Sequence, residues 1–343
     1  MMPITLTPVN IIHIAYVTLA LFSILLVIGR APYKALVLLL AAHLIQEFLN
    51  PFEELQITQY LLTPAFQLAF GPLYYLFVKN LIYGDLNIRQ HLIHLLPAVI
   101  ALALTRWWPI ELMVAFVILV IYIVASFRLI LRYHRILKQT LSDGENHSLI
   151  WLTRTFSVIF LIELIDFTRL NLQQTLSDEI LVNWYFVSAL VSLLCTAYLV
   201  IKAVRQPVLY GGISRLETSL GASAIPAEKD LELAKTIFAA IESHQYETGA
   251  YRQPKYSLRN LAEDMQLTEQ NVSWALNRGG EKNFSDFINE LRLEEVKQLL
   301  KQNKNTKNVL DIAFAAGFSS KSTFNAVFKK STGMTPSQYL QQD

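Results

Sequence analysis

The sequence contains a single cysteine, Cys195, so an internal disulfide is excluded. A cysteine-based zinc site needs several thiolates and is not expected either, and we interpret Cys195 as a small apolar helix residue. Charged residues are also scarce, at 16% against about 25% in typical soluble domains, whereas 53% of the chain is hydrophobic. Because the apolar residues concentrate before residue 206, the chain is expected to meet two different solvents.

Short catalytic signatures are absent as well. The chain has no glycine-rich phosphate loop, no H-E-x-x-H pair, no nucleophile elbow and no paired cysteine motif. The sequence therefore predicts a protein that is not an enzyme and that uses no metal and no cofactor. This exclusion is weaker for the apolar half, because a transporter or a membrane enzyme can lack short signatures.

Apolar stretches dominate the first 205 residues. A helix needs about 20 mostly apolar residues to cross a bilayer, because no water there can satisfy free backbone groups. The sequence predicts a transmembrane bundle of about seven helices, in which the second and fourth spans are the shortest. The predicted spans are 9–29, 34–50, 61–82, 91–106, 110–132, 150–169 and 182–203.

Lysine and arginine are distributed unevenly between the two sides of these spans. If the N-terminus lies outside, the inner connections carry Arg30, Lys34, Lys79, Arg89, Arg128, Arg132, Arg135, Lys138, Arg154, Lys202 and Arg205. The outer connections carry little besides Arg106 and Arg169. This asymmetry predicts a multi-pass protein of a bacterial inner membrane with its C-terminal part in the cytoplasm. The first ten residues lack the positive start of a cleaved signal peptide, so the first span is expected to be retained.

A few ionisable residues lie inside the predicted spans. Glu163, Asp166 and Arg169 recur along one stripe of the sixth span, and His43 and Glu47 are one turn apart on the second. Charges at such depth usually face a cavity or one another. We expect these five residues to form the signal or ligand site, and a local ion-pair stripe at the interface is the alternative for the first three.

Residues 206–228 are rich in glycine, serine and proline and predict a flexible linker. The remaining residues, 229–343, form the second predicted domain. It begins with an amphipathic stretch, residues 230–244, that either packs on its own domain or contacts a second copy of the chain.

Two helix-turn-helix patterns follow. In residues 257–277, SLRNLAEDMQLTEQNVSWALN, Gln266 and Leu267 turn the chain and Thr268 caps the next helix. In residues 308–330, NVLDIAFAAGFSSKSTFNAVFKK, Gly317 supplies the turn, and either Ser319 or Ser320 caps the second helix. A long helix over residues 284–300 is expected to join the two motifs, so the fold class is all-α throughout.

The second motif carries a resemblance to a known family. The stretch IAFAAGFSSKSTFNAVFKKSTGMTPSQYL closely resembles the signature of the AraC/XylS transcription regulators, and the likeness covers about residues 229–341. The apolar half, including GPLYYLFVKN, is similar to a subgroup in which a multi-span membrane domain replaces the soluble effector domain. The resemblance implies bacterial transcriptional control, commonly activation, with RNA polymerase as a partner. It also places Arg292 where relatives keep an arginine, for which a structural ion pair is the expectation.

Helical geometry indicates which side chains reach DNA. With Val272 and Leu276 inward, and Phe324 and Phe328 inward on the second helix, polar residues lie on the opposite arcs, which suit the major groove. The resemblance adds Lys321, and the nearby cations are candidates for phosphate contacts. The predicted DNA-binding residues are Gln270, Ser273, Trp274, Asn277, Arg278, Lys321, Ser322, Asn325, Lys329 and Lys330. Trp274 is equally compatible with a position inside the domain.

Together these patterns predict a membrane-embedded transcription regulator whose partners are promoter DNA, the lipid bilayer and an unidentified small-molecule or membrane signal. Self-association as a homodimer is the expected route by which the signal changes promoter occupancy. The alternative is a receptor or transporter-like membrane protein whose DNA-binding tail is secondary. A discrete DNA footprint favours the first reading, and salt-sensitive binding that ignores sequence favours the second.

Overall fold

The structure is a computed structural model, and it describes residues 7–30, 33–54, 61–84, 87–103, 107–142, 148–172, 175–206, 229–302 and 309–340. Every regular element in these ranges is a helix, and the β-structure they contain is an isolated bridge between Leu141 and Ser257. The all-α prediction is therefore confirmed. The chain divides into two compact units, Met1–Leu131 with Leu149–Gly211, and Arg132–Ser148 with Gly212–Asp343. We call them, after the sequence predictions for each half, the membrane unit and the DNA-binding unit.

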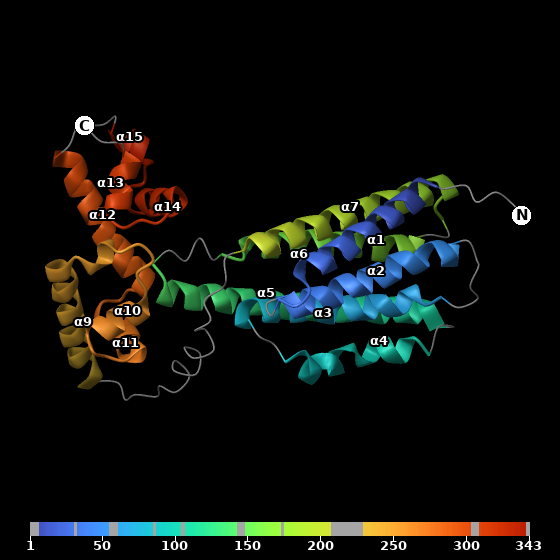
Figure 1. The fold of residues 1–343 in the computed structure, drawn as a ribbon, viewed down its shortest axis with the longest axis horizontal. Helices are drawn as coiled ribbons and strands as arrows, with labels where there is room; N and C mark the ends of the chain where they lie inside the picture. The colour runs from blue at the N-terminus through green and yellow to red at the C-terminus, as the bar shows by residue number, and fades with distance from the viewer. Residues whose placement is uncertain are drawn as a thin grey trace, which may run out of the picture. The chain divides into compact units, whose positions relative to one another are not determined.

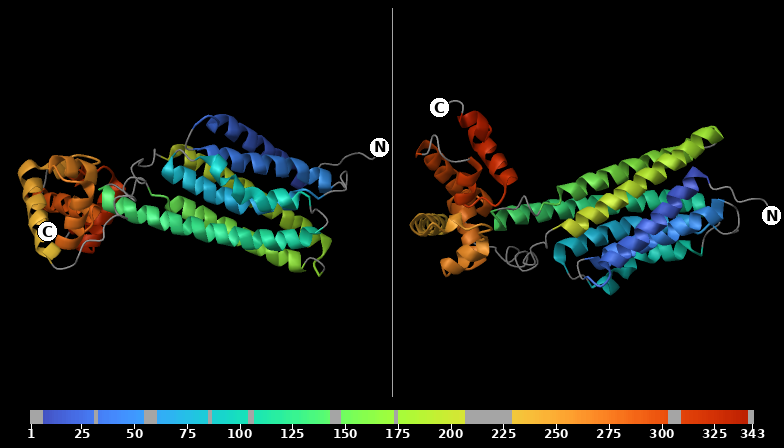
Figure 2. Two further views of the ribbon diagram at one scale, coloured as in Figure 1. Left: turned by 90° about the horizontal axis from the view of Figure 1, so that it is seen from below. Right: turned by 45° about the horizontal axis from the view of Figure 1, so that its top comes forward.

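The membrane unit is built from helices that run side by side along a common direction (Figures 1 and 2). Helix α1 packs against α2 and α7, α2 against α3, and α6 against α7. The helices are α1 (Pro8–Val27), α2 (Lys34–Glu54), α3 (Thr63–Tyr83), α4 (Leu96–Ala101), α5 (Trp108–Thr140), α6 (Ile150–Leu172) and α7 (Asp178–Arg205). Four of them, α1, α2, α5 and α7, are long and apolar enough to cross a membrane.

The fourth predicted span does not form one long helix. Residues 88–101 fold as a 3-10 helix, η2 (Ile88–Leu95), followed by the six-residue α4. Pro97 stands at the start of α4, where its missing N–H group cannot extend hydrogen bonding from the preceding turn. At about 1.5 Å per residue, α4 is much too short to cross a bilayer by itself.

Two sequence features explain how α3 is positioned. The Glu53 carboxylate accepts hydrogen bonds from the backbone N–H groups of Leu62 (2.7 Å) and Thr63 (3.0 Å), which satisfies donors that a helix start leaves unpaired. Gly71, inside α3, lies against the backbone of α5, because a Cβ atom there would come within 3.0 Å of the Leu119 Cα. The glycine thus permits close helix packing, as small residues do in membrane bundles.

The first helix-turn-helix of the DNA-binding unit has the predicted turn and the predicted cap of its second helix. Helix α10 (Leu258–Asp264) starts at Ser257, whose hydroxyl caps it, and the turn passes through Gln266 at φ 55°. Helix α11 (Glu269–Gly279) is capped by Thr268, whose side chain accepts from the Asn271 N–H at 3.1 Å. Helix α9 (Lys229–Thr248) packs along α11, so the amphipathic stretch before the motifs does pack on its own domain.

The second helix-turn-helix follows the long connecting helix α12 (Phe284–Gln302). It consists of α13 (Val309–Ala315), a turn at Gly317 with φ 98°, and α14 (Lys321–Thr332). Ser320 is the cap, since its hydroxyl accepts from the Thr323 N–H at 3.1 Å. A Thr335 cap then starts the short α15 (Pro336–Leu340). The buried core of this motif is Leu293, Val296, Leu300, Ile312, Ala313, Ala316, Phe318, Phe324 and Phe328.

Arg292 of α12 joins the two motifs. Its side chain is fully buried, and it donates hydrogen bonds to the backbone carbonyls of Tyr251 (2.7 Å) and Gln253 (2.9 Å), which precede the first motif. Its guanidinium also lies 6.0 Å from the ring centroid of Phe318 in the second. The planar fork of an arginine is well suited to these two carbonyl contacts, and the expected ion pair of Arg292 stays a prediction.

Candidate functional site

Helix α14 presents one continuous exposed stripe opposite its core face. Thr323, Phe324 and Phe328 are buried, which fixes the side of the helix that faces the domain. The exposed residues of the helix are Lys321, Ser322, Asn325, Ala326, Lys329, Lys330 and Ser331. All five predicted contact residues of this helix are therefore at the surface, where an amide, a hydroxyl and three cations can reach a DNA groove together.

Helix α11 presents a narrower surface than the sequence predicted. Asn277 and Arg278 are exposed, and Gln270 and Trp274 are half-buried. Ser273, however, is only 4% exposed, so its side chain lies within the domain. The prediction for Ser273 is corrected by this burial.

Helix α9 accounts for the burial on α11. A Cβ atom at Gly279 would clash with the Ala234 backbone, and one at Gly280 would clash with the Phe238 ring, so α9 packs tightly on this end of α11. Because α9 covers a second side of α11, fewer residues of α11 are exposed than the helical wheel predicted. The wheel considered only the side of Val272 and Leu276 as buried.

The observed burial of α11 adds one residue, Asn271, to the candidate DNA-binding residues of this helix. Asn271 is exposed and lies three residues before Trp274 and seven before Arg278, which places all three on one stripe. The Asn277 side chain, by contrast, donates a 2.7 Å hydrogen bond to the carbonyl of Ser273 on its own helix. Asn277 must give up this bond before its amide can pair with a base.

The arrangement of the two motifs is fixed by close packing. A Cβ atom at Gly317 would come within 2.7 Å of the Arg252 carbonyl oxygen, so the turn of the second motif lies directly on the chain that precedes the first. The Arg252 guanidinium forms a 2.7 Å ion pair with Glu295 of α12. Together with Arg292, these contacts pack the two motifs against each other within one compact unit.

The lysine and arginine side chains of the two recognition helices differ in the contacts that they make. Lys330 forms an exposed 3.1 Å ion pair with Asp286 of α12. Such surface pairs contribute about 0–1 kcal/mol, so Lys330 can exchange this partner for a phosphate at little cost. Lys329, Lys321 and Arg278 are exposed on the recognition helices themselves.

In the membrane unit, His43 and Glu47 do not pair with each other but with other helices. Glu47 lies 2.5 Å from the His13 Nδ1 of α1, and both residues are buried. The His43 ring stacks on Phe70 at 4.2 Å, and its Nε2 lies 3.5 Å from the Tyr74 hydroxyl.

Tyr16 extends this group toward α7. Its ring centroid lies 5.4 Å from that of His43, and its hydroxyl lies 2.5 Å from the Thr196 Oγ1. We call His13, Tyr16, His43, Glu47, Tyr74 and Thr196 the polar cluster. Sequence reasoning missed four of them, although polar residues one turn apart in an apolar span, such as His13 and Tyr16, were a usable signal.

On α6, two residues of the predicted stripe, Asp166 and Arg169, form an ion pair with each other. Arg169 bonds Asp166 through Nε (2.8 Å) and Nη2 (3.1 Å), and it donates to the Tyr185 hydroxyl of α7 at 2.9 Å. Its guanidinium also lies over the Tyr185 ring, 4.5 Å from the centroid. Arg169 is thus a buried link between α6 and α7, and Glu163 is half-buried on the same helix.

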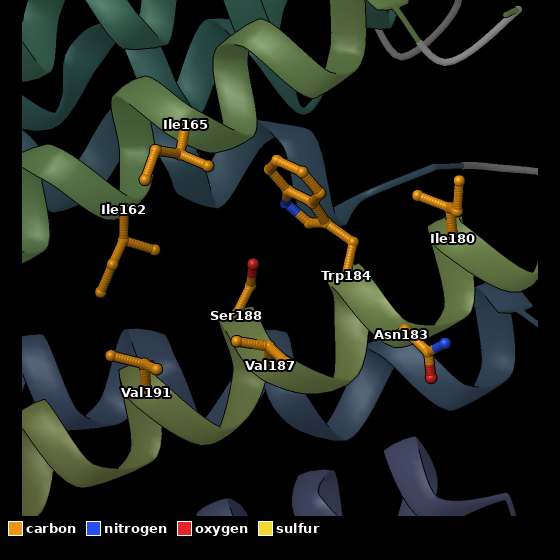
Figure 3. Close-up of a pocket in the computed structure, with 8 residues that line it drawn as sticks. All are labelled: Ile162, Ile165, Ile180, Asn183, Trp184, Val187, Ser188 and Val191. Atoms are coloured by element: carbon orange, nitrogen blue, oxygen red, sulfur yellow. The ribbon is translucent and has the colours of Figure 1, made fainter. Parts of the chain in front are cut away.

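An apolar groove of about 490 Å³ lies between α6 and α7 (Figure 3). Figure 3 shows the Trp184 ring and the Ser188 hydroxyl pointing from α7 into the space beside Ile162 and Ile165. The Trp184 indole N–H is buried and has no hydrogen-bond partner among the described residues. The volume lies in the range of small-molecule pockets, about 300–1,000 Å³.

Comparison with known proteins gives a family match within the DNA-binding unit. Residues 261–342 match the family described as "Helix-turn-helix domain". An 83-residue segment, 24% of this chain, is 32% identical to 27% of the Melibiose operon regulatory protein of Escherichia coli (strain K12). A 98-residue segment, 29% of the chain, is 30% identical to 32% of the HTH-type transcriptional activator RhaR of Yersinia pseudotuberculosis serotype O:3 (strain YPIII).

The matched segments span about a third or less of the length of these curated relatives. No solved structure matches the chain significantly. The motifs, the geometry and these relatives agree that the C-terminal part of the chain is an AraC-type domain with two helix-turn-helix motifs.

Proposed function

We propose that this protein is a membrane-embedded transcription regulator that binds promoter DNA sequence-specifically through both helix-turn-helix motifs and responds to a signal at the membrane. The observation that carries the proposal is the exposed stripe of α14, held outward by a capped helix start and a buried aromatic core. A second recognition helix, α11, belongs to the same compact unit. Two such helices about 34 Å apart can enter successive major grooves on one face of a duplex.

The groups on these stripes suit different parts of DNA. The Asn325 amide can form two hydrogen bonds with an adenine edge, a contact worth about 1–3 kcal/mol of discrimination. Lys321, Lys329 and Arg278 are suited to phosphates, which position the domain without reading sequence. Gln270 and Trp274 supply an amide and a flat apolar surface on the first recognition helix. No step of this function needs a catalytic group, and RNA polymerase and a second copy of the chain are the protein partners that we propose.

The membrane half of the proposal rests on composition and packing. Four helices are long and apolar enough to cross a bilayer, and the basic residues near the ends of the spans favour a cytoplasmic DNA-binding unit. The polar cluster is our candidate for the place where a signal is read. Burying His13 and Glu47 in an apolar bundle costs free energy, and ionisable residues kept at such depth usually serve a function.

The DNA-binding proposal is tested with the full-length protein in lipid nanodiscs. A DNase protection assay on genomic fragments should give a discrete footprint on a subset of sequences. Asn325→Ala should weaken binding about fivefold or more to the preferred site but little to other DNA, whereas Lys235→Ala, on the exposed surface of α9, should change neither. Binding that ignores sequence in the wild type would instead favour a receptor or transporter with a secondary DNA-binding tail.

The signal site has a separate test. Glu47→Gln replaces the carboxyl group beside His13 with an amide of nearly the same volume, so it should change reporter output from the footprinted promoter while the footprint of the purified protein stays the same. Glu179→Gln, at the exposed start of α7, is the matched control. If both variants give wild-type output under every growth condition tried, the polar cluster is not the sensor.

A further inference from the structure

The membrane unit and the DNA-binding unit are joined in sequence by more than the segment 207–228. Helix α5 contains 33 residues, which at about 1.5 Å each make a rod of about 50 Å. A bilayer core needs about 20 residues, so roughly a dozen residues of α5 exceed the span. Its last part belongs to the DNA-binding unit, which includes Arg132–Ser148.

The residues that follow α5 make specific buried contacts inside the DNA-binding unit. Leu141 forms an antiparallel bridge with Ser257, and the Ser142 hydroxyl donates to the Tyr256 carbonyl at 2.8 Å. The Asn289 amide of α12 donates to the Ser142 carbonyl at 3.1 Å. Ser142 is 1% exposed, so this is a packed joint rather than a surface contact.

The joint lies where the first motif begins. Ser257 caps α10, and the Tyr256 hydroxyl donates to Asp264 at the end of the same helix (2.6 Å) and accepts from Gln245 of α9 (3.2 Å). Burial and the Asp264 carboxylate raise the pKa of Tyr256, so its hydroxyl stays a donor at neutral pH. The dipeptide Leu141–Ser142 therefore contacts Tyr256 and Ser257, which in turn contact α9 and α10. It also contacts α12 through Asn289.

We propose that Leu141–Ser142 is the coupling joint of this protein: a displacement of α5 reaches the first recognition motif there, and not through residues 207–228. Two observations favour this route. A helix transmits displacement along its length, whereas a segment of glycine and small polar residues does not. The joint also leaves the exposed faces of α11 and α14 uncovered, so it can reorient the motif without blocking DNA. The inference rests on the proposed function, because it assumes that the unit binds DNA.

The first test measures the joint itself in the full-length protein in nanodiscs. Ser142→Ala removes one buried hydrogen bond, worth a factor of about five in an opening equilibrium. Hydrogen exchange should therefore become about fivefold faster both in residues 136–142 and in residues 256–261. Ser243→Ala, an exposed serine of α9, is the control and should change neither stretch. Unchanged exchange in both stretches would overturn the docked joint.

The second test separates the two routes in cells. Two glycines inserted after Leu137 interrupt the end of α5, whereas two glycines inserted after Gly221 lengthen the other connection. We expect the first insertion to shift reporter output by more than twofold from wild type, and the second to leave output within twofold of wild type. The reverse pattern would overturn the coupling joint. Footprints of the purified proteins distinguish the failure of the two proposals. A wild-type protein that gives no footprint contradicts the proposed function and not the coupling joint.

Discussion

Replacing Arg292 tests whether the two motifs act as one rigid unit. The side chain is fully buried and makes two hydrogen bonds, of 2.7 and 2.9 Å, to carbonyls on the far side of the motif interface. A hydrogen bond from a charged donor contributes about 1.5–3 kcal/mol, so losing both bonds in Arg292→Met should cost about 3–6 kcal/mol. Arg292→Lys can keep one of the two bonds and should cost about half as much, since an ammonium lacks the fork of a guanidinium.

The loss is measured on the full-length protein in nanodiscs by pulse proteolysis across a urea series, which reports unfolding of the soluble unit. At a urea slope of about 1–3 kcal/mol/M, Arg292→Met should lower the midpoint by at least about 1 M. The control is Arg259→Met, which removes an exposed guanidinium paired with Glu263 at 2.8 Å and should cost less than about 0.5 kcal/mol. Equal midpoints for Arg292→Met and the control would refute the reasoning.

The same variants have a consequence for DNA binding. Two recognition helices held in one unit bind their half-sites as a single event, because the second contact is then intramolecular. Arg292→Lys should therefore separate the footprint into two protected segments that appear at different protein concentrations. Simultaneous protection in every destabilised variant would show that other contacts, such as Arg252 with Glu295, hold the interface.

Further changes test the turns, the caps and the phosphate contacts. Gly317→Ala places a Cβ within 2.7 Å of the Arg252 carbonyl oxygen at φ 98°, and we expect a loss of at least about 2 kcal/mol in urea unfolding. Ser320→Ala should cost about 1 kcal/mol in the same assay, whereas Ser320→Asp keeps a capping oxygen and should restore most of it. Lys329→Ala should weaken DNA binding similarly on all sequences and reduce the slope of log affinity against log salt by about 1; an unchanged slope would remove Lys329 from the phosphate contacts.

The helix caps and turns of the DNA-binding unit were predictable because they depend on residues that are close together in the sequence. The Thr268 cap and the Gly317 turn each follow from backbone geometry that only certain residues satisfy. The choice between Ser319 and Ser320 was not predictable, since both spacings permit a cap. Only the position of the Thr323 N–H decides it.

The errors in the sequence analysis arise where packing partners come from elsewhere in the chain. Ser273 was placed outward by a wheel centred on Val272 and Leu276, which took no account of α9 on a second side of α11. His43 and Glu47 were read as neighbours because helical spacing brings them together. Spacing within a helix says nothing about the other helices, and it was His13 and Tyr74 that supplied the contacts.

Domain boundaries pose the same problem in a stronger form. The composition of residues 206–228 indicates one connection between the two halves, because glycine and small polar residues stand out against apolar spans. The α5 end has no such signal: Arg132–Ser148 looks like an ordinary helix end and turn, yet it belongs to the compact unit that contains both motifs. A fragment that starts at residue 206 or 229 therefore lacks Ser142, whose carbonyl accepts a hydrogen bond from the Asn289 amide and whose hydroxyl donates to the Tyr256 carbonyl. Such a fragment loses contacts inside the DNA-binding unit as well as the membrane unit. Regulation therefore has to be tested with changes in the intact chain.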